Sequence, residues 1–297
     1  MAAPSPLSRT PEERFAALPG FPYEPRYTDV DGLRIAWVEA GPADGPPVVL
    51  FHGEPTWSFL WRTVIPPLAD AGLRCLAADM PGFGRSDKPE DLGWYSYDRH
   101  VGVLLAWLDQ LDVRAATAVV HDWGGPIGMR CFVERPERFE RIVIMDTGFF
   151  TGEQPMTEAW IAFRNFVERT EDLPVGFLVD GGTRRELEPA EVAAYEAPFP
   201  TVASKAGARA FPLILPTSPD APGAAAGRRV RDAMVADERP KLLIWADGDP
   251  IIPLAAGRRI AELLGADPPA VIPQASHFLQ EDGGEEIGRR IAAWLSA

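Results

Sequence analysis

Short apolar runs alternate with helix-like segments along most of the chain. Residues 26–40 alternate apolar and polar positions around Asp31-Gly32, which indicates a β-hairpin. The later apolar runs are short and bounded by turn-forming residues, so each predicts a buried strand. They cover residues 46–53, 73–80, 116–122, 141–148, 241–249 and 268–277. Helical patterns follow, near 59–71 and 97–111 among others. This alternation predicts a mostly parallel sheet covered by helices on both faces.

Residues 149–226 interrupt this rhythm. The segment contains one clear helical stretch, EAWIAFRNFVERT, and several proline-rich stretches, but no repeat of strand and helix. We therefore predict a single α/β core domain formed by residues 1–148 and 227–297, into which residues 149–226 are inserted as a helical cap.

Composition and charge restrict the partners of this domain. Hydrophobic residues make up 46% of the 297 residues, which is enough for a substantial core. The formal net charge of −14 argues against nucleic acid and anionic membranes, because both are polyanions. No apolar run is long enough to cross a membrane, and residues 1–15 lack the apolar region of a signal peptide. We expect a soluble, cytoplasmic protein.

The chain has only two cysteines, Cys75 in an apolar strand-like run and Cys131 in a helical run. So few cysteines favour buried free thiols over a disulfide framework or a metal cluster.

The candidate chemistry lies where the predicted strands end. In open parallel sheets the reactive groups sit at the carboxyl ends of the strands. The polar residues at these positions are His52, Glu54, Asp79, Asp122, Asp146, Asp247, Asp249 and His277.

Asp122 occupies a turn between an apolar run and a helical pattern, in the sequence HDWGGPIG. In many hydrolases such a turn presents a nucleophile, and small residues are needed there because backbone segments approach closely. Gly124 and Gly125 meet this need, whereas Val120 is larger than the glycine usual upstream. The alternative role of Asp122 is a helix N-cap, but the other strand ends favour a nucleophile.

His277 follows the last predicted strand, at the position expected for a general base. The chain order of nucleophile, acid and histidine makes Asp249 the predicted acid, since it lies in a loop from which it can turn toward His277. Asp247, two residues earlier, and Asp146, at the end of another strand, are the alternatives for the acid.

The loop after the first buried strand has the sequence HGEPTW. Its backbone N–H at Glu54, together with the N–H of Trp123 after the nucleophile, predicts an oxyanion hole. The simpler interpretation of His52-Gly53 is a tight turn.

Several segments together resemble the haloalkane dehalogenases of the α/β-hydrolase superfamily, namely HGEPTWS, DMPGFGRSDKP, HDWGG, ASHFLQE and AAYEAPFP. The resemblance runs from about residue 9 to the C-terminus, and HGEPTW with AAYEAPFP is its most specific part. It implies an α/β-hydrolase fold with a mostly parallel eight-stranded sheet, helices on both faces and an inserted helical cap. The implied activity is hydrolysis of a haloalkane by water to an alcohol, halide and a proton, without a metal or cofactor.

The resemblance is strongest to the subfamily that holds the halide with two tryptophans. It implies that Asp122 attacks the halogen-bearing carbon to form an alkyl ester. His277, oriented by Asp249, would then activate the water that hydrolyses this ester. Trp123 and Trp160 would be the two halide ligands.

A halide in an apolar pocket needs hydrogen-bond donors, because its burial without them is costly. Trp123 offers an indole N–H, whereas an ionised Glu54 cannot donate. Trp160 is the one tryptophan of the predicted cap and therefore the candidate for the second donor. Its alternative role is a hydrophobic anchor of the cap helix, since Phe163 and Phe166 lie at helical spacing from it.

Three other functions stay open. Epoxide hydrolases share the aspartate nucleophile, but that family needs an acid for the epoxide oxygen, supplied by a pair of cap tyrosines; the predicted cap offers only Tyr195. Fluoroacetate-type dehalogenases place an arginine after the aspartate, where this chain has Trp123. A ligand-binding module on an inactive hydrolase scaffold would be expected to lack the nucleophile, the acid or the base.

Overall fold

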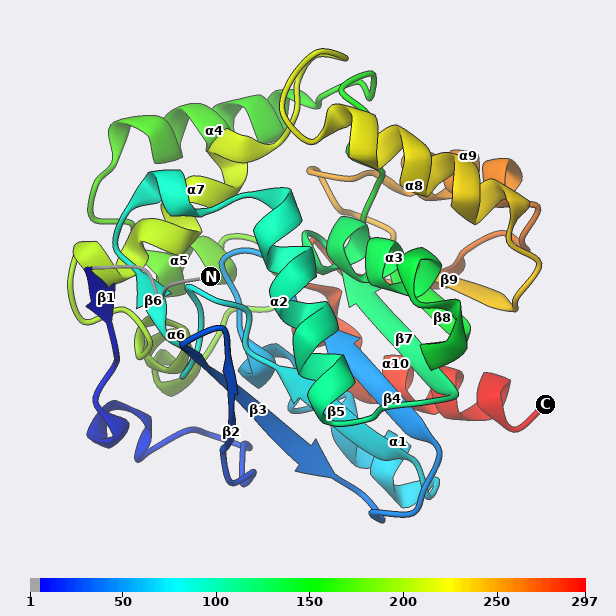
Figure 1. The fold of residues 1–297 in the computed structure, drawn as a ribbon, viewed down its shortest axis with the longest axis horizontal. Helices are drawn as coiled ribbons and strands as arrows, with labels where there is room; N and C mark the ends of the chain where they lie inside the picture. The colour runs from blue at the N-terminus through cyan, green and yellow to red at the C-terminus, as the bar shows by residue number, and fades with distance from the viewer. Residues whose placement is uncertain (1–5) are drawn as a thin grey trace.

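The structure, a computed structural model, describes residues 6–297, and its centre is an eight-stranded sheet (Figure 1). The strands in spatial order are β10 (Ala270–Ile272), β9 (Lys241–Ala246), β8 (Phe139–Met145), β7 (Ala116–His121), β4 (Pro47–Phe51), β5 (Arg74–Ala78), β3 (Leu33–Ala40) and β2 (Arg26–Val30). The neighbours from β10 to β5 pair in parallel, and β3 is antiparallel to both of its neighbours. This arrangement confirms the predicted mostly parallel sheet and the hairpin within residues 26–40.

Helices cover both faces of the sheet (Figure 1). They are α1 (Ile65–Asp70), α2 (Tyr97–Gln110), α3 (Gly124–Glu134), α8 (Ala224–Ala236), α9 (Leu254–Leu264) and α10 (Leu279–Leu295). α2, α3 and α8 pack side by side on one face, while α1 packs against α10 on the other. The buried residues Val101, Leu104 and Leu108 recur along α2 at spacings of three and four, so one side of this helix faces the core.

The inserted segment lies beyond the carboxyl ends of the parallel strands (Figure 1). Its helices are α4 (Glu158–Arg169), α5 (Val175–Asp180), α6 (Pro189–Glu196) and α7 (Ala206–Ile214). No strand occurs between residues 149 and 226. α8 begins at Ala224 and packs against α3, so the predicted boundary at residue 226 falls inside a helix of the core.

Short elements depart most from the predicted pattern. β1 (Leu7–Ser8) pairs antiparallel with β6 (Lys88–Pro89), and strands of two residues carry no periodic signal. The strand expected over 268–277 is confined to β10, because Pro273 follows it and has no N–H to donate to a neighbouring strand. The short 3₁₀ helices are η1 (Glu12–Phe15), η2 (Ser58–Trp61), η3 (Leu92–Trp94), η4 (Pro136–Arg138) and η5 (Ala203–Lys205).

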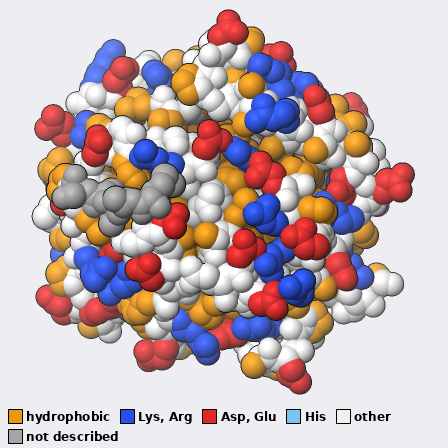
Figure 2. Space-filling model, viewed as in Figure 1, with side chains coloured by type: hydrophobic (Ala, Val, Ile, Leu, Met, Phe, Trp, Pro, Cys, Tyr) orange, Lys and Arg blue, Asp and Glu red, His pale blue; other side chains and the backbone are white. Residues whose placement is uncertain are grey.

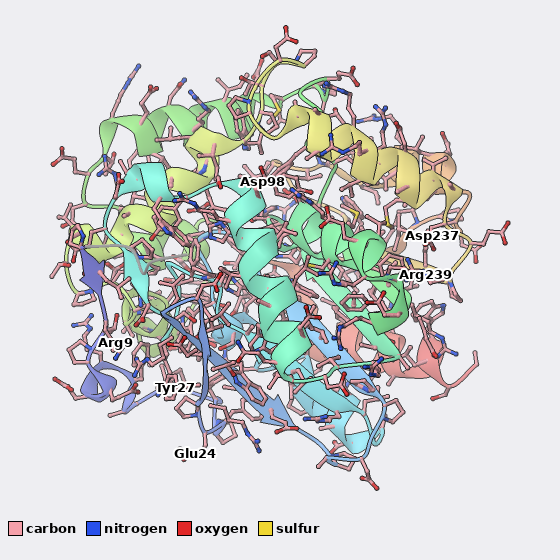
Figure 3. All side chains as sticks on the ribbon, in the orientation of Figure 1. Arg9, Glu24, Tyr27, Asp98, Asp237 and Arg239 are labelled. Carbon is pink, nitrogen blue, oxygen red and sulfur yellow. The ribbon has the colours of Figure 1, made fainter. Side chains whose placement is uncertain are left out.

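The surface carries interspersed acidic and basic side chains on the face drawn in Figure 2. Some neighbours pair directly, as Asp237 and Arg239 do after α8 at 2.6 Å (Figure 3). Cys75 and Cys131 are buried free thiols, as predicted. Within residues 6–297 no helix combines the length and apolarity needed to cross a membrane. The prediction about a signal peptide concerns residues 1–15, of which residues 1–5 lie outside the described part.

Candidate active site

Asp122 lies at a sharp turn between β7 and α3, with a φ of +48° in the left-handed region. Close backbone contacts explain the glycines around it. A Cβ atom on Gly124 would lie 2.1 Å from the carbonyl oxygen of Phe51, and one on Gly53 would lie 2.3 Å from Asp122 Oδ1. α3 begins without a side-chain cap, so Asp122 does not serve as its N-cap. The turn instead presents the carboxylate beyond the end of the sheet.

The sharp turn at Asp122 with its flanking strand and helix, here called the elbow, accommodates Val120 because another glycine faces it. A Cβ atom on Gly128 of α3 would lie 2.5 Å from Val120 Cγ1. A small residue on the strand usually makes room for the helix. Here the small residue is Gly128 on the helix, so β7 and α3 still pack closely. The sequence pattern around Val120 therefore did not reveal Gly128, the glycine that makes room for the valine side chain.

The Asp122 carboxylate is held by a backbone donor and by a histidine. The N–H of Glu54 donates to Oδ1 at 2.8 Å. Burial raises the pKa of Asp122, but the hydrogen bond and charge of His277 and the N–H of Trp123 outweigh it, so this pKa lies below its ordinary value. The carboxylate is therefore charged, as a nucleophile must be.

His277 lies between two carboxylates. Its Nε2 is 3.5 Å from Asp122 Oδ2, and its Nδ1 donates to Asp249 Oδ2 at 2.9 Å. Burial lowers the pKa of His277, but the charge of Asp249 and the hydrogen bonds to both carboxylates raise it well above its ordinary value. The structure thus brings together the residues predicted as nucleophile, acid and base.

Asp249 is held in place by the loop after β9. Its Oδ1 accepts the N–H groups of Ile251 at 2.7 Å and Ile252 at 3.1 Å, which aims Oδ2 at His277. Burial raises the pKa of Asp249, but the charge and hydrogen bond of His277 and these backbone donors lower it overall. Asp249 is therefore an ionised partner for the imidazole ring.

Other polar residues at the strand ends bind backbone groups instead of the histidine ring. The N–H groups that they accept are those of Gln274 and Ala275 for Asp247, Ser58 and Arg85 for Asp79, and Met80 for His52. Asp247, one alternative acid, therefore holds the loop that carries His277 but does not contact its ring. The other alternative, Asp146, is fully buried, and its Oδ1 accepts the N–H of Ala246 at 3.0 Å.

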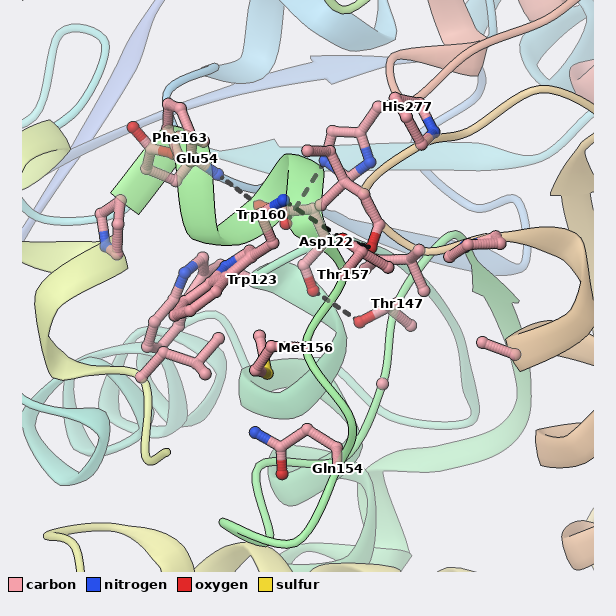
Figure 4. A pocket seen from close by; sticks show the side chains of 18 of the residues that line it. Glu54, Asp122, Trp123, Thr147, Gln154, Met156, Thr157, Trp160, Phe163 and His277 are labelled. Carbon is pink, nitrogen blue, oxygen red and sulfur yellow. Dashed lines mark hydrogen bonds and ion pairs between the residues drawn. The ribbon is translucent and has the colours of Figure 1, made fainter. Parts of the chain in front are cut away.

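An apolar cavity of about 840 Å³ opens over Asp122 (Figure 4). It is lined by the strand-end loops and by the inserted segment. Its lining includes Glu54, Asp122, Trp123, Trp160 and His277, together with apolar side chains such as Phe150, Met156, Phe163, Leu215 and Ile252. A mostly apolar cavity with a few polar groups at one place is typical of a small-molecule site.

Trp123 and Trp160 both border this cavity (Figure 4). Neither indole N–H has a hydrogen-bond partner among residues 6–297, whereas Trp245 donates its N–H to a backbone carbonyl. Unpartnered indoles also occur at Trp61 and Trp107, but these two do not line the cavity. Trp123 and Trp160 therefore offer the cavity two free N–H donors.

The surroundings of Glu54 bear on one premise of the sequence prediction. Its side chain is only 5% exposed and lines the cavity, and its Oε1 has no partner among the described residues. Burial and the neighbouring charge of Asp122 raise the pKa of Glu54 well above its ordinary value, which favours the neutral acid. The sequence prediction treated Glu54 as ionised, and this raised pKa argues against that premise. A neutral Glu54 could donate a hydrogen bond, so Trp160 can no longer be chosen as the second halide donor by excluding Glu54. The position of Trp160 in the cavity lining supports that choice independently.

Tyr195 lies outside the cavity lining. Its side chain is fully buried, and its hydroxyl donates to Glu281 of α10. The one tyrosine of the predicted cap is thus committed to a structural hydrogen bond and cannot serve as an acid in the cavity.

The chain is similar to known proteins over nearly all of its length. A family model described as the alpha/beta hydrolase fold matches residues 46–284. A haloalkane dehalogenase of Mycobacterium marinum is 44% identical over 293 residues, with 96% of this chain and 98% of that protein covered. A haloalkane dehalogenase of Psychrobacter cryohalolentis is 39% identical, with 97% and 98% covered.

Solved structures have the same fold. The tetrameric haloalkane dehalogenase DpaA of Paraglaciecola agarilytica superposes with a TM-score of 0.89 at 34% identity, covering 96% of this chain and 97% of that one. The haloalkane dehalogenase DbeA of Bradyrhizobium elkani gives a TM-score of 0.81 at 27% identity, with 92% and 98% covered.

Proposed function

The chain belongs to the haloalkane dehalogenase family of the α/β-hydrolase fold, and we propose that it hydrolyses carbon–halogen bonds through an alkyl ester on Asp122. One observation carries the proposed mechanism. The charged Asp122 carboxylate faces an apolar cavity, with the Glu54 N–H on one oxygen at 2.8 Å and His277 beside the other at 3.5 Å. Such a carboxylate can attack a haloalkane carbon and later be restored by hydrolysis.

In the first step an oxygen of Asp122 attacks the halogen-bearing carbon. The new C–O bond forms as the carbon–halogen bond breaks, and the halide leaves with the electron pair. Charge grows on the halogen in the transition state, so donors aimed at it accelerate this step. We assign this role to the indole N–H groups of Trp123 and Trp160, which are free of other partners.

In the second step His277 takes a proton from water, whose oxygen attacks the ester carbonyl carbon. Asp249 keeps the other proton on Nδ1, so Nε2 is available as the base. The N–H groups of Glu54 and Trp123 stabilise the oxyanion that forms on Asp122. Its collapse expels the alkyl oxygen, which takes the proton from His277 and leaves as alcohol. The remaining proton of the water passes to solvent as the carboxylate reforms.

We infer that residues 149–226 act as a cap that supplies one wall of the cavity. A buried ion cluster supports this docking. Arg62 of the core pairs with Glu191 of α6 at 2.6 Å and also with Glu281 of α10. Because Arg62 and Glu281 are buried and Glu191 is half-buried, removing one partner would leave a poorly compensated charge at the junction.

The substrates of the proposed reaction are a haloalkane and water. We expect the reaction to occur in the cytoplasm, where the buried free thiols of Cys75 and Cys131 would stay reduced. The location of the tagged protein after cell fractionation tests this expectation.

The function is tested by incubating the purified protein with 1-bromobutane and with styrene oxide, then measuring bromide and diol. We expect bromide without diol. Diol without bromide would make the protein an epoxide hydrolase, and neither product would leave a ligand-binding module. The position of Tyr195 outside the cavity favours the dehalogenase, because no tyrosine among residues 6–297 lines the cavity to protonate an epoxide oxygen.

Replacing Trp160 with phenylalanine should weaken halide binding while leaving the fold intact. Phenylalanine keeps most of the ring but lacks the N–H. A hydrogen bond to a charged group contributes about 1.5–3 kcal/mol. Carbon–halogen cleavage should therefore slow by roughly 10- to 100-fold. Bromide titration by tryptophan fluorescence and single-turnover bromide release measure the two effects.

The matched control for this variant is Trp294→Phe, the same substitution in α10 outside the cavity. It should bind bromide and turn over like the unmodified protein. If Trp160→Phe did so as well, Trp160 would be a packing residue of α4, and the neutral Glu54 would become the next candidate for the second donor.

Replacing Asp249 with asparagine should slow hydrolysis of the ester more than its formation. The amide cannot hold His277 as the Nδ1–H tautomer or balance its charge. By analogy with Ser-His-Asp triads, the loss should be on the order of 10³- to 10⁴-fold. Rapid-quench mass spectrometry should find the ester on the Asp122 peptide. Normal turnover of Asp249→Asn, together with loss of turnover in Asp146→Asn, would assign the acid to Asp146.

A further inference from the structure

Asp146 follows β8 at the carboxyl edge of the sheet, and its side chain is fully buried. Its φ of +32° lies in the left-handed region, which a residue other than glycine keeps only where its surroundings hold it. Both neighbouring strands do so. The Asp146 carbonyl accepts the N–H of Asp122 at 3.3 Å, and Oδ1 accepts the N–H of Ala246 at 3.0 Å. The backbone of Asp146 is thus tied to the turn of Asp122, and its side chain is tied to the end of β9.

The second carboxyl oxygen, Asp146 Oδ2, is buried and receives no donor from residues 6–297. The neighbouring Asp249 carboxyl group contributes its charge and a side-chain interaction to the raised pKa of Asp146, and Oδ2 is the Asp146 oxygen left without a partner to face it. Two buried carboxylates in contact would repel each other and leave lone pairs unsatisfied. A single proton between them removes both penalties.

The surroundings decide which carboxyl holds this proton. Asp249 receives the N–H of His277 and two backbone N–H groups, all of which favour its charged form. Asp146 receives only the N–H of Ala246. Burial and the charge of Asp249 raise the pKa of Asp146 well above its ordinary value, whereas the pKa of Asp249 is lowered.

We propose that Asp146 is a proton-bearing positioning residue, whose neutral carboxyl accepts the Ala246 N–H at Oδ1 and donates from Oδ2 to Asp249. This role deepens the dehalogenase mechanism proposed above and rests on it. Asp146 touches neither substrate nor reacting atoms, and it acts on His277 only through Asp249.

The hydrogen bond from Asp146 adjusts the strength of His277 as a base. In the free enzyme two carboxylates favour the protonated imidazole, which cannot accept a proton from water. Formation of the ester removes the charge of Asp122. Donation from Asp146 spreads the remaining charge of Asp249, so the pKa of His277 falls further and more of the base form is present near neutral pH.

The charged groups around Asp146 are consistent with a neutral acid. Asp249 faces it from the loop after β9, and His277 faces it from the loop before α10. His121 on β7 is neutral near pH 7, because burial lowers its pKa to about 4. Among residues 6–297 no arginine or lysine pairs with Asp146, so no fixed cation would hold it ionised.

Two substitutions separate a neutral Asp146 from an ionised one. Asparagine reproduces the neutral acid, since its oxygen can accept from Ala246 and its NH₂ can donate to Asp249. Leucine has a similar size and no donor. The rate of ester hydrolysis is measured in single turnovers from about pH 5 to about pH 9. The fall of this rate toward low pH, the acid limb of the pH–rate profile, reports the pKa of His277 in the ester.

We expect Asp146→Asn to keep this acid limb within about 0.3 pH units of the unmodified protein, and Asp146→Leu to move it upward by roughly one unit. A downward shift in Asp146→Asn would mean that the substitution removed a negative charge, and would overturn the proposal. So would unmoved limbs in both variants with only a lower Tm, since Asp146 would then have a purely structural role.

An infrared measurement keeps the test independent of catalysis and of the folding of the leucine variant. The difference spectrum between the unmodified protein and Asp146→Asn should contain the C=O stretch of one protonated carboxylic acid. A lost carboxylate band in its place would overturn the proposal. Bromide release by the unmodified protein is scored separately, so failure of the dehalogenase function and failure of this role give different results.

Discussion

Replacing Asp122 with asparagine is expected to abolish steady turnover of haloalkanes, by roughly 10⁴-fold or more, as removal of a nucleophile does in other hydrolases. The amide is a poor nucleophile toward a saturated carbon. Its oxygen can still accept the Glu54 N–H that now binds Oδ1 at 2.8 Å, so the elbow should keep its shape. Bromide release from 1-bromobutane measures the loss. The exposed Asp220→Asn is the control and should retain full activity.

Isotope labelling separates attack by Asp122 from direct attack by water. In a single turnover in water labelled with heavy oxygen, the alcohol should carry ordinary oxygen from the carboxylate, and the label should enter the Asp122 peptide. Direct attack by water would label the alcohol at once. Bromide release at the unmodified rate from Asp122→Asn, in samples shown by mass spectrometry to be free of deamidation, would remove Asp122 from the mechanism.

The turn at Asp122 and the meeting of the proposed nucleophile, acid and base could be predicted because their signals are local. A strand, an aspartate and two glycines lie within a few residues around Asp122, and steric contact makes those glycines necessary. His277 and Asp249 follow two other predicted strands, and parallel strands end at one edge of a sheet. The sheet therefore brings together residues that are far apart in the chain.

Protonation states could not be predicted in the same way. Sequence alone treats Glu54 and Asp146 as ordinary ionised carboxyls. Each acquires a raised pKa because folding removes it from water and places a second carboxylate beside it. Which carboxylates become neighbours depends on strand order, and β8 and β9 are separated in the chain by the whole inserted segment.

The inserted segment illustrates a different limit. The sequence contained a readable start signal for α6, since Glu188 and Glu191 form a capping box and Pro189 stands in the first helical position. α7 has no such signal and contains Pro212 within the helix, so local propensity argues against it. Burial of Phe211 and its neighbours against the core favours that helix instead. The contribution of Trp160 to the cavity likewise depends on how α4 docks.

Replacing His277 with phenylalanine is expected to leave the first chemical step and to block the second. Attack by Asp122 on carbon needs no base, whereas hydrolysis of the ester needs a group to take a proton from water. The variant should release about one bromide per protein molecule and then stop. Intact-protein mass spectrometry should find an added alkyl group, and digestion should place it on the Asp122 peptide. Loss of the base should slow steady turnover by at least about 100-fold.

A control with both substitutions, Asp122→Asn and His277→Phe, should give neither bromide nor adduct, because the oxygen that forms the ester is gone.

The unmodified protein offers a second check through pH. His277 acts as a base only when neutral, so hydrolysis should fail as the pH falls through its pKa in the ester, and the same adduct should then accumulate. Repeated turnover by His277→Phe without any trapped adduct would mean that another group activates the water. If the unmodified protein also formed no adduct at low pH, the alkyl ester would be removed from the mechanism.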